Sequence, residues 1–110
     1  MFSKKSTTDL MLQNKEDIKK MADELELILM KTSKNEEIQQ SLKYAIDKVK
    51  YFNPSIEKVI LDIDKRINNK IGDLKIEIVK AKNERDNEKF LKNVKELTIE
   101  LIEKRDIKSR

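Results

Sequence analysis

The residues best suited to chemistry in this chain are two aspartates, Asp62 and Asp64, in an Asp-x-Asp pattern. The segment from Asp62 to Asp73 spans twelve residues, which is the length of a calcium-binding EF-hand loop. The match fails inside the segment, because Arg66 stands fifth and Ile67 stands sixth, where the turn needs glycine. We therefore expect no metal site. We expect both aspartates on a solvated helix face, with Asp62 paired to Arg66 one turn later.

The composition argues against most other catalytic chemistry. The chain has no histidine and no cysteine, so it lacks the usual proton shuttle, thiolate nucleophiles and the commonest ligands of zinc and iron. Its single glycine cannot form a phosphate-binding loop. Carboxylates and lysines catalyse when burial shifts their pKa values, and the apolar pattern contains no carboxylate. We expect a protein that is not an enzyme and that uses no cofactor.

Two tyrosines, Tyr44 and Tyr51, are one heptad apart and flank Ala45 and Phe52. Two interpretations fit them. Their rings can pack at the edge of a core with the hydroxyls in water, or they can anchor a protein partner. The sequence favours the first interpretation and leaves the second open.

The element that must position these side chains is a long amphipathic helical pattern. Its apolar residues alternate at spacings of four and three, the 3.5-residue period of a coiled coil, and one eleven-residue unit follows. Such a seam needs another helix to cover it. The seam residues are Ile38, Leu42, Ala45, Val49, Phe52, Ile56, Val59, Ile63, Ile67, Ile71, Leu74 and Ile78, and the pattern resumes at Phe90, Val94, Leu97 and Leu101.

Polar breaks divide this pattern into helices within one domain of 110 residues. Residues 1–7 read as a frayed terminus. The predicted helices span about residues 8–31, 34–52, 54–82 and 86–107.

The sequence leaves open whether the breaks near Ser33, Pro54 and Asp86 are turns or kinks. Ser33 and Asp86 can each cap a new helix. Asn53 can cap another, with Pro54 at its first position, or the helix can kink at Pro54 and continue. The unbroken seam register favours two nearly colinear segments.

One segment has a second interpretation as a β-hairpin. Leu74, Ile76 and Ile78 alternate as in a strand, and Asn68-Asn69 or Gly72-Asp73 could form the turn. The helical interpretation accounts for more of the apolar positions. Inside a helix, Gly72 costs about 1 kcal/mol relative to alanine, which indicates a bend or a close helix contact.

The charge is mild, with 25 basic and 21 acidic residues and a net charge of +4. A basic tail contains Lys104, Arg105, Lys108 and Arg110. Such cations suit a solvated helix C-terminus, and nucleic-acid contact is the alternative. The acidic region is residues 23–37, and its charge could steer helix one against a later helix or into an antiparallel dimer.

The sequence therefore predicts an all-α protein, a three- or four-helix bundle with coiled-coil-like packing, with long kinked antiparallel helices as a variant. A straight seam over residues 38–81 would be about 65 Å long, so we expect a homodimer or a complex with another helical protein. The longest apolar run, residues 27–30, is too short to span a bilayer, and no signal peptide is evident. We expect a cytoplasmic location.

For function, the leading hypothesis is a non-enzymatic structural or adaptor protein that acts through helix–helix contacts. The first alternative is a nucleic-acid-linked regulatory protein that uses basic helix faces or the basic tail. The second is a small helical chaperone or inhibitor that covers a client helix.

Overall fold

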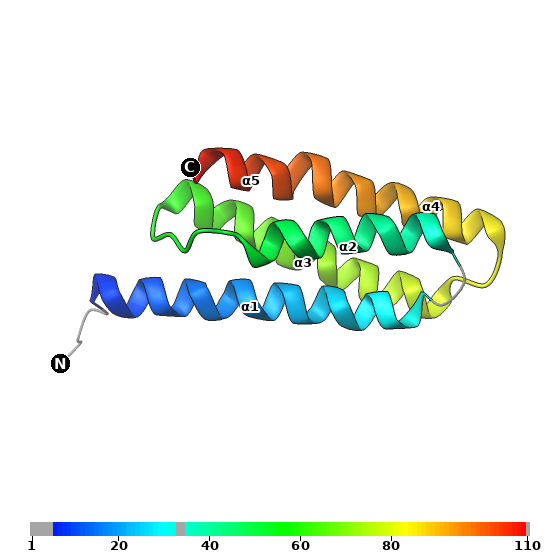
Figure 1. The fold of residues 1–110 in the computed structure, drawn as a ribbon, viewed down its shortest axis with the longest axis horizontal. Helices are drawn as coiled ribbons and strands as arrows, with labels where there is room; N and C mark the ends of the chain where they lie inside the picture. The colour runs from blue at the N-terminus through cyan, green and yellow to red at the C-terminus, as the bar shows by residue number, and fades with distance from the viewer. Residues whose placement is uncertain (1–5, 33–34, 110) are drawn as a thin grey trace.

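The chain folds into four helical rods, which confirms the predicted all-α bundle (Figure 1). The computed structural model describes residues 6–32 and 35–109, and no strand occurs among them, so the hairpin interpretation is wrong. The fourth rod is continuous and contains a π-helical segment, η1. The elements in chain order are α1 (Thr7–Lys31), α2 (Glu36–Lys50), α3 (Lys58–Lys80), α4 (Glu84–Glu96), η1 (Leu97–Ile102) and α5 (Glu103–Lys108).

Polar side chains begin three of the four rods. Ser6, Asn35 and Asn83 each accept a hydrogen bond from the backbone N–H three residues later, which satisfies one of the free amides of a helix start. The predicted cap Asp86 instead lies within the first turn of α4. The predicted cap at position 33 lies outside the described residues.

The connection over residues 51–57 reverses the chain, so the prediction of nearly colinear segments around Pro54 is wrong. α2 and α3 run in opposite directions, and Glu57 precedes α3 without a side-chain capping bond (Figure 1). Asn53 therefore does not cap α3. Two hydrogen bonds from other segments hold the connection instead, one to the Asn53 carbonyl and one from the Ser55 N–H.

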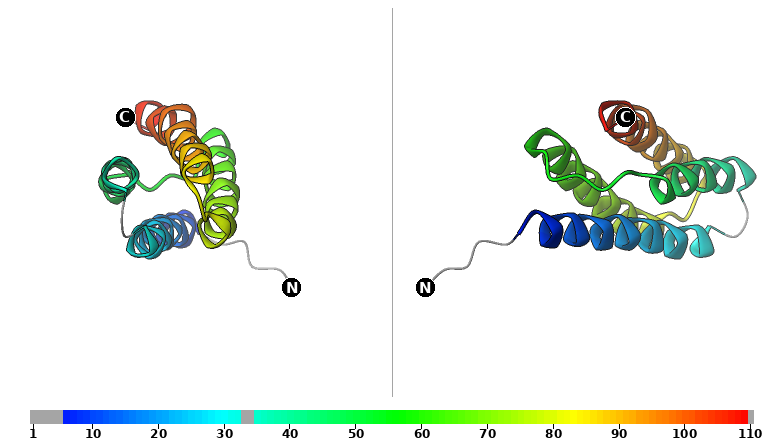
Figure 2. Two further views of the ribbon diagram at one scale, coloured as in Figure 1. Left: turned by 90° about the vertical axis from the view of Figure 1, so that its right-hand side faces the viewer. Right: turned by 60° about the vertical axis from the view of Figure 1, so that its left-hand side comes forward.

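The connection crosses one end of the bundle diagonally. α1 packs against α2 and α3, and α4 also packs against α2 and α3. Viewed along the bundle, α2 and α3 therefore lie at opposite corners, as the left panel of Figure 2 shows. The same end, which we call the crossover end, holds the start of α1 and all of α5 (Figure 1).

The seam residues lie mostly inside the bundle, where the chain's own helices cover them. The seam does not run straight, because its two halves on α2 and α3 are antiparallel (Figure 1). The longest dimension of the bundle is 54 Å. Ile78 is partly buried against the core. The fully or nearly buried members are Ile38, Leu42, Ala45, Val49, Phe52, Ile63, Ile67, Ile71 and Leu74.

Two predicted seam residues lie outside the core. Ile56 is 40% exposed and Val59 is 54% exposed, whereas Ile60 is completely buried. The reason is the break in the helix. Since α3 starts afresh at Lys58, its apolar face is set by its own packing and need not follow the register of α2.

The fourth rod changes phase at its π-helical segment. An α-helical continuation of the pattern predicts Leu101 in the core, but Leu101 is only partly buried and Ile102 is completely buried. A π turn has i→i+5 bonds and so holds an extra residue, which shifts the following side chains by about one position. Within it, the Thr98 hydroxyl donates to the Val94 carbonyl at 2.9 Å.

Gly72 lies in the middle of α3 without a close contact. A Cβ atom built there would meet no atom within 4 Å, and its φ is not positive. The predicted close helix contact is therefore absent within the described chain, and the bundle does not require glycine at this position.

Two substitutions at adjacent positions test which side of α3 faces the core. Ile60→Ala should lower the free energy of unfolding by about 2–5 kcal/mol, because it leaves a cavity in the core. Val59→Ala should change it by about 0.5 kcal/mol or less, because the side chain is largely in water. Urea unfolding followed by circular dichroism measures both, and equal losses would show that the assigned phase is wrong.

Candidate functional site

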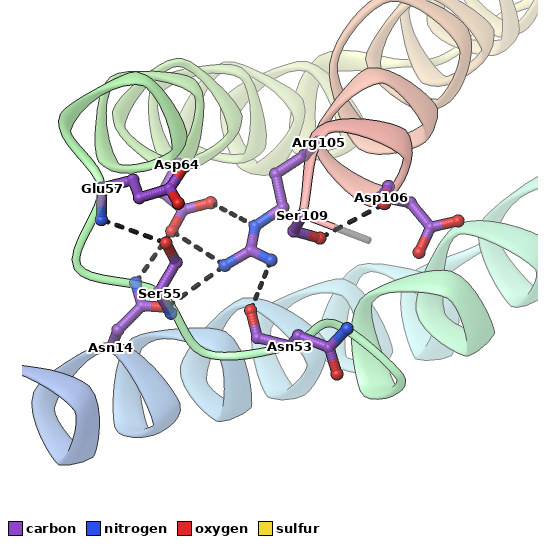
Figure 3. A network of polar contacts seen from close by, with 8 residues as sticks. All are labelled: Asn14, Asn53, Ser55, Glu57, Asp64, Arg105, Asp106 and Ser109. Atoms are coloured by element: carbon purple, nitrogen blue, oxygen red, sulfur yellow. Dashed lines mark hydrogen bonds and ion pairs between the residues drawn. The ribbon is translucent and has the colours of Figure 1, made fainter.

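Arg105 lies completely buried at the crossover end of the bundle. Its guanidinium donates from Nε to Asp64 Oδ1 at 3.0 Å, from Nη2 to Asn14 Oδ1 at 3.1 Å and from Nη1 to the Asn53 carbonyl at 2.6 Å (Figure 3). Its Cζ atom also lies 4.5 Å from the centre of the Phe52 ring, within cation–π range. The prediction of a solvated position in a basic tail is wrong for Arg105.

Asp64 and Asn14 complete this network. Asn14 Nδ2 donates to Asp64 Oδ2 at 2.8 Å, and Asn14 Oδ1 also accepts the Ser55 N–H at 2.9 Å. Asp64 is 5% exposed, so the predicted solvated face holds only for Asp62. The predicted pair between Asp62 and Arg66 does not form in the described structure.

We call Asn14, Asn53, Asp64 and Arg105 the crossover latch, because they join α1, the connection, α3 and α5. One positive charge faces one negative charge. Among the described residues, every buried side-chain nitrogen and oxygen has a hydrogen-bond partner. The described residues also contain no group of three acidic, histidine or cysteine side chains that could hold a metal ion. A closed, satisfied network of this kind fixes the fold rather than offering groups to a ligand.

The two predicted partner anchors have different surroundings. The Tyr44 hydroxyl donates to Glu103 Oε1 at 2.8 Å, and Lys48 Nζ lies 5.8 Å from the ring centre. This bond to a carboxylate raises the pKa of Tyr44 above its ordinary value of 10.0. Tyr51 is 82% exposed and has no polar partner among the described residues. Tyr51 alone is free to contact a partner with its whole ring.

Acidic residues of the 23–37 region pair with later helices, as the charge distribution suggested. Glu24 lies 3.1 Å from Lys75 on α3, and Glu26 lies 2.9 Å from Lys50 on α2. Such exposed pairs contribute little stability. They nevertheless show which residues of neighbouring helices lie beside each other along the bundle.

Four exposed aliphatic side chains lie at one level of the neighbouring helices α1 and α3. Leu27 and Met30 are 55% and 77% exposed, and Ile76 and Val79 are 57% and 68% exposed. The members of each pair are three residues apart and so are neighbours on their helix. Since α1 and α3 run parallel and Glu24 meets Lys75, both pairs lie at the same level. We call these four residues the α1/α3 face.

The sequence did contain a signal for the latch. Asp64 is four residues after Ile60 and three before Ile67, Asn14 is four before Ile18, and Arg105 is three after Ile102. Each polar residue therefore falls on the apolar face of its helix. Three polar residues on the apolar faces of three helices indicate a shared buried network. Asp64 and Arg105 are recognised in this way only when the buried sides of α3 and α5 have been assigned correctly.

No known protein family, curated protein or solved structure matches this chain. Among the described residues, no helix is both long enough and apolar enough to cross a membrane. The function must therefore be argued from the molecule itself.

The latch can be tested by removing one charge and then both. Arg105→Met should lower the free energy of unfolding by about 3–5 kcal/mol, because it leaves Asp64 buried without its counter-ion. Adding Asp64→Leu should restore much of this loss, since a buried ion pair can be replaced by apolar residues. Urea unfolding measures both, with exposed Arg66→Met as the control. A loss below about 1 kcal/mol for Arg105→Met would contradict the buried pair.

The Tyr44–Glu103 bond has its own test at high pH. In a Tyr51→Phe variant, Tyr44 is the only tyrosine, and its absorbance near 295 nm should titrate above pH 10.0. Because the folded pKa is raised, the bond stabilises the fold below the ordinary pKa and is lost as the pH rises through the raised value. Glu103→Gln should lower the midpoint, and an unchanged midpoint would argue against the bond.

Proposed function

We propose that this chain is a non-enzymatic structural or adaptor protein that acts through helix–helix contacts with other proteins, including a second copy of itself. The observation that carries this proposal is the α1/α3 face. Its four aliphatic side chains lie at one level of two neighbouring helices and remain largely exposed. Clustered apolar surface of this kind marks protein interaction sites, whereas single exposed aliphatic residues are ordinary.

The exposed surface supports a partner contact on the outer faces of the helices, whereas the sequence predicted a contact through the seam residues. The seam residues are used to hold the monomer together, so a partner would have to bind the outer faces of the helices. A helix laid along α1 and α3 would cover their four exposed side chains in the i, i+3 manner of helix recognition. Gly72 lies one turn before Ile76 and has open space around it, which would allow the partner backbone to come close.

Two observations make the alternatives weaker. Nucleic-acid binding needs clustered cations, but Arg105 is buried in the latch and its neighbours Glu103 and Asp106 bear negative charge. A chaperone or inhibitor that covers a client helix would need an open apolar groove, and the seam that could have formed one is occupied by the chain's own helices.

The proposal can be tested by photo-crosslinking. With p-benzoylphenylalanine in place of Ile76, irradiation in an extract of the source cells should give covalent adducts with protein, either a second copy or another chain. The same residue at Lys92, on the exposed side of α4, is the control and should give none. Leu27→Ser should lower the adduct yield by about tenfold, because burying a leucine contributes about 1.5–3 kcal/mol.

Failure has a clear form in this experiment. If position 76 gives no protein adduct, or if positions 76 and 92 give the same adducts, the α1/α3 face is not an interaction surface and the proposed function is wrong.

A further inference from the structure

The solvent side of α1 carries a second ordered pattern. Six exposed residues follow one another at spacings of three or four, so they share one face of the helix, opposite the face that enters the core. Apolar residues stand at both ends of this face and charged residues in the middle. We call it the α1 stripe: Leu12, Glu16, Lys19, Asp23, Leu27 and Met30.

The charged side chains of the α1 stripe have no salt bridge within the described chain, although the pKa of Lys50, raised chiefly by its bond to Glu26, is raised further by the charge of Asp23. The side chains of Glu16, Lys19 and Asp23 form no salt bridge or hydrogen bond with any described residue. Their neighbours Glu24 and Glu26, at the edges of the same helix, are both paired with lysines of α3 and α2.

Four of the six residues of this stripe are complementary to one another about its centre. Leu12 and Met30 each lie nine residues from Met21, and Lys19 and Asp23 each lie two residues from it. We infer that the α1 stripe packs antiparallel against the α1 stripe of a second copy, about a two-fold axis at the level of Met21. Leu12 then meets Met30 of the other copy, Lys19 meets Asp23, and the symmetry forms each contact twice.

A slide of one turn and a parallel arrangement each bring like charges together. Sliding one copy by one turn places Asp23 opposite Asp23 of the other copy in one direction, and Glu16 opposite Asp23 in the other. A parallel arrangement places Lys19 beside Lys19. A slide of two turns pairs Glu16 with Lys19, but it sets Leu12 against Asp23. Since like charges at an interface are unfavourable, the register centred on Met21 is favoured over these arrangements.

Gly72 gives a second, independent reason to place the axis there. The Asn14–Asp64 and Glu24–Lys75 contacts show which residues of α3 lie beside which residues of α1. By either contact, residues 71–72 lie beside Met21 and therefore at the level of the proposed two-fold axis. The only glycine of the chain thus stands where α3 of one copy comes nearest to α3 of the other. Its open surroundings leave room for that approach, which explains a glycine that the monomer does not need.

The inference rests on the proposed function, since it names the second copy as a partner, and its test uses the purified full chain. Sedimentation equilibrium should show the wild type as a dimer of twice 13.0 kDa. Lys19→Glu alone and Asp23→Lys alone should each weaken dimerisation by about tenfold or more, because each places like charges together twice.

A mixture and a double variant distinguish this register from a general charge effect. Mixing Lys19→Glu with Asp23→Lys should restore the dimer as a heterodimer, because each altered charge then meets its opposite. The double variant Lys19→Glu/Asp23→Lys should also dimerise. Lys92→Glu, on the exposed side of α4, is the control and should leave the dimer intact.

Gly72→Leu supplies a steric test on α3. The monomer has open space there and leucine favours a helix more than glycine does, so the variant should keep its circular dichroism spectrum and resist urea at least as well as the wild type while it dimerises at least about tenfold more weakly. A wild type that stays monomeric up to about 1 mM, or single variants that dimerise as well as the wild type, would overturn the inference. If the inference fails in this way, a crosslink from position 76 to another protein would still support the proposed function.

Discussion

One buried charge joins the segments that meet at the crossover end of the bundle. Arg105 is completely enclosed, and a buried guanidinium without a counter-ion and hydrogen-bond acceptors is strongly destabilising. Its partners come from α1, from the connection over residues 51–57 and from α3. The docked position of the last helix therefore involves all three segments. The diagonal crossing carries the Asn53 carbonyl to the guanidinium, where it accepts a hydrogen bond from Nη1 at 2.6 Å.

The π-helical segment and the latch act on the same rod. By adding a residue to the turn, the Leu97–Ile102 segment brings Ile102 into the core in place of Leu101. Downstream, α5 then contacts two opposite corners of the bundle. Arg105 binds Asp64 on α3, while Glu103 and Asp106 contact Tyr44 and Lys48 on α2. The short last helix holds together the two helices that do not otherwise pack closely.

The surface divides into charges that the fold uses and charges that it leaves free. At the edges of α1, Glu24 and Glu26 bind lysines on the neighbouring helices. On its outer face, the charged side chains of the α1 stripe form no salt bridge or hydrogen bond within the described chain, and the aliphatic ones are largely exposed. The proposed function and the proposed two-fold contact both use this outer layer, so substitutions there separate association from folding. Core and latch substitutions cannot do so, because they act on the fold itself.

The sequence by itself determined the helical class, the approximate helices and most of the core. A heptad period of apolar residues specifies which side of a helix is buried whatever lies against it, which is why Ile38 and Leu74 were placed in the core correctly. Only the tertiary structure decided the position of Ile56, Val59 and Ile60, since a break in the helix resets the phase and its geometry depends on bonds from distant segments. The fates of Arg105 and Asp64 were also decided there. Each is charged and looks solvated along the chain, and it becomes stable in the interior only when the other, 41 residues away, arrives with the opposite charge.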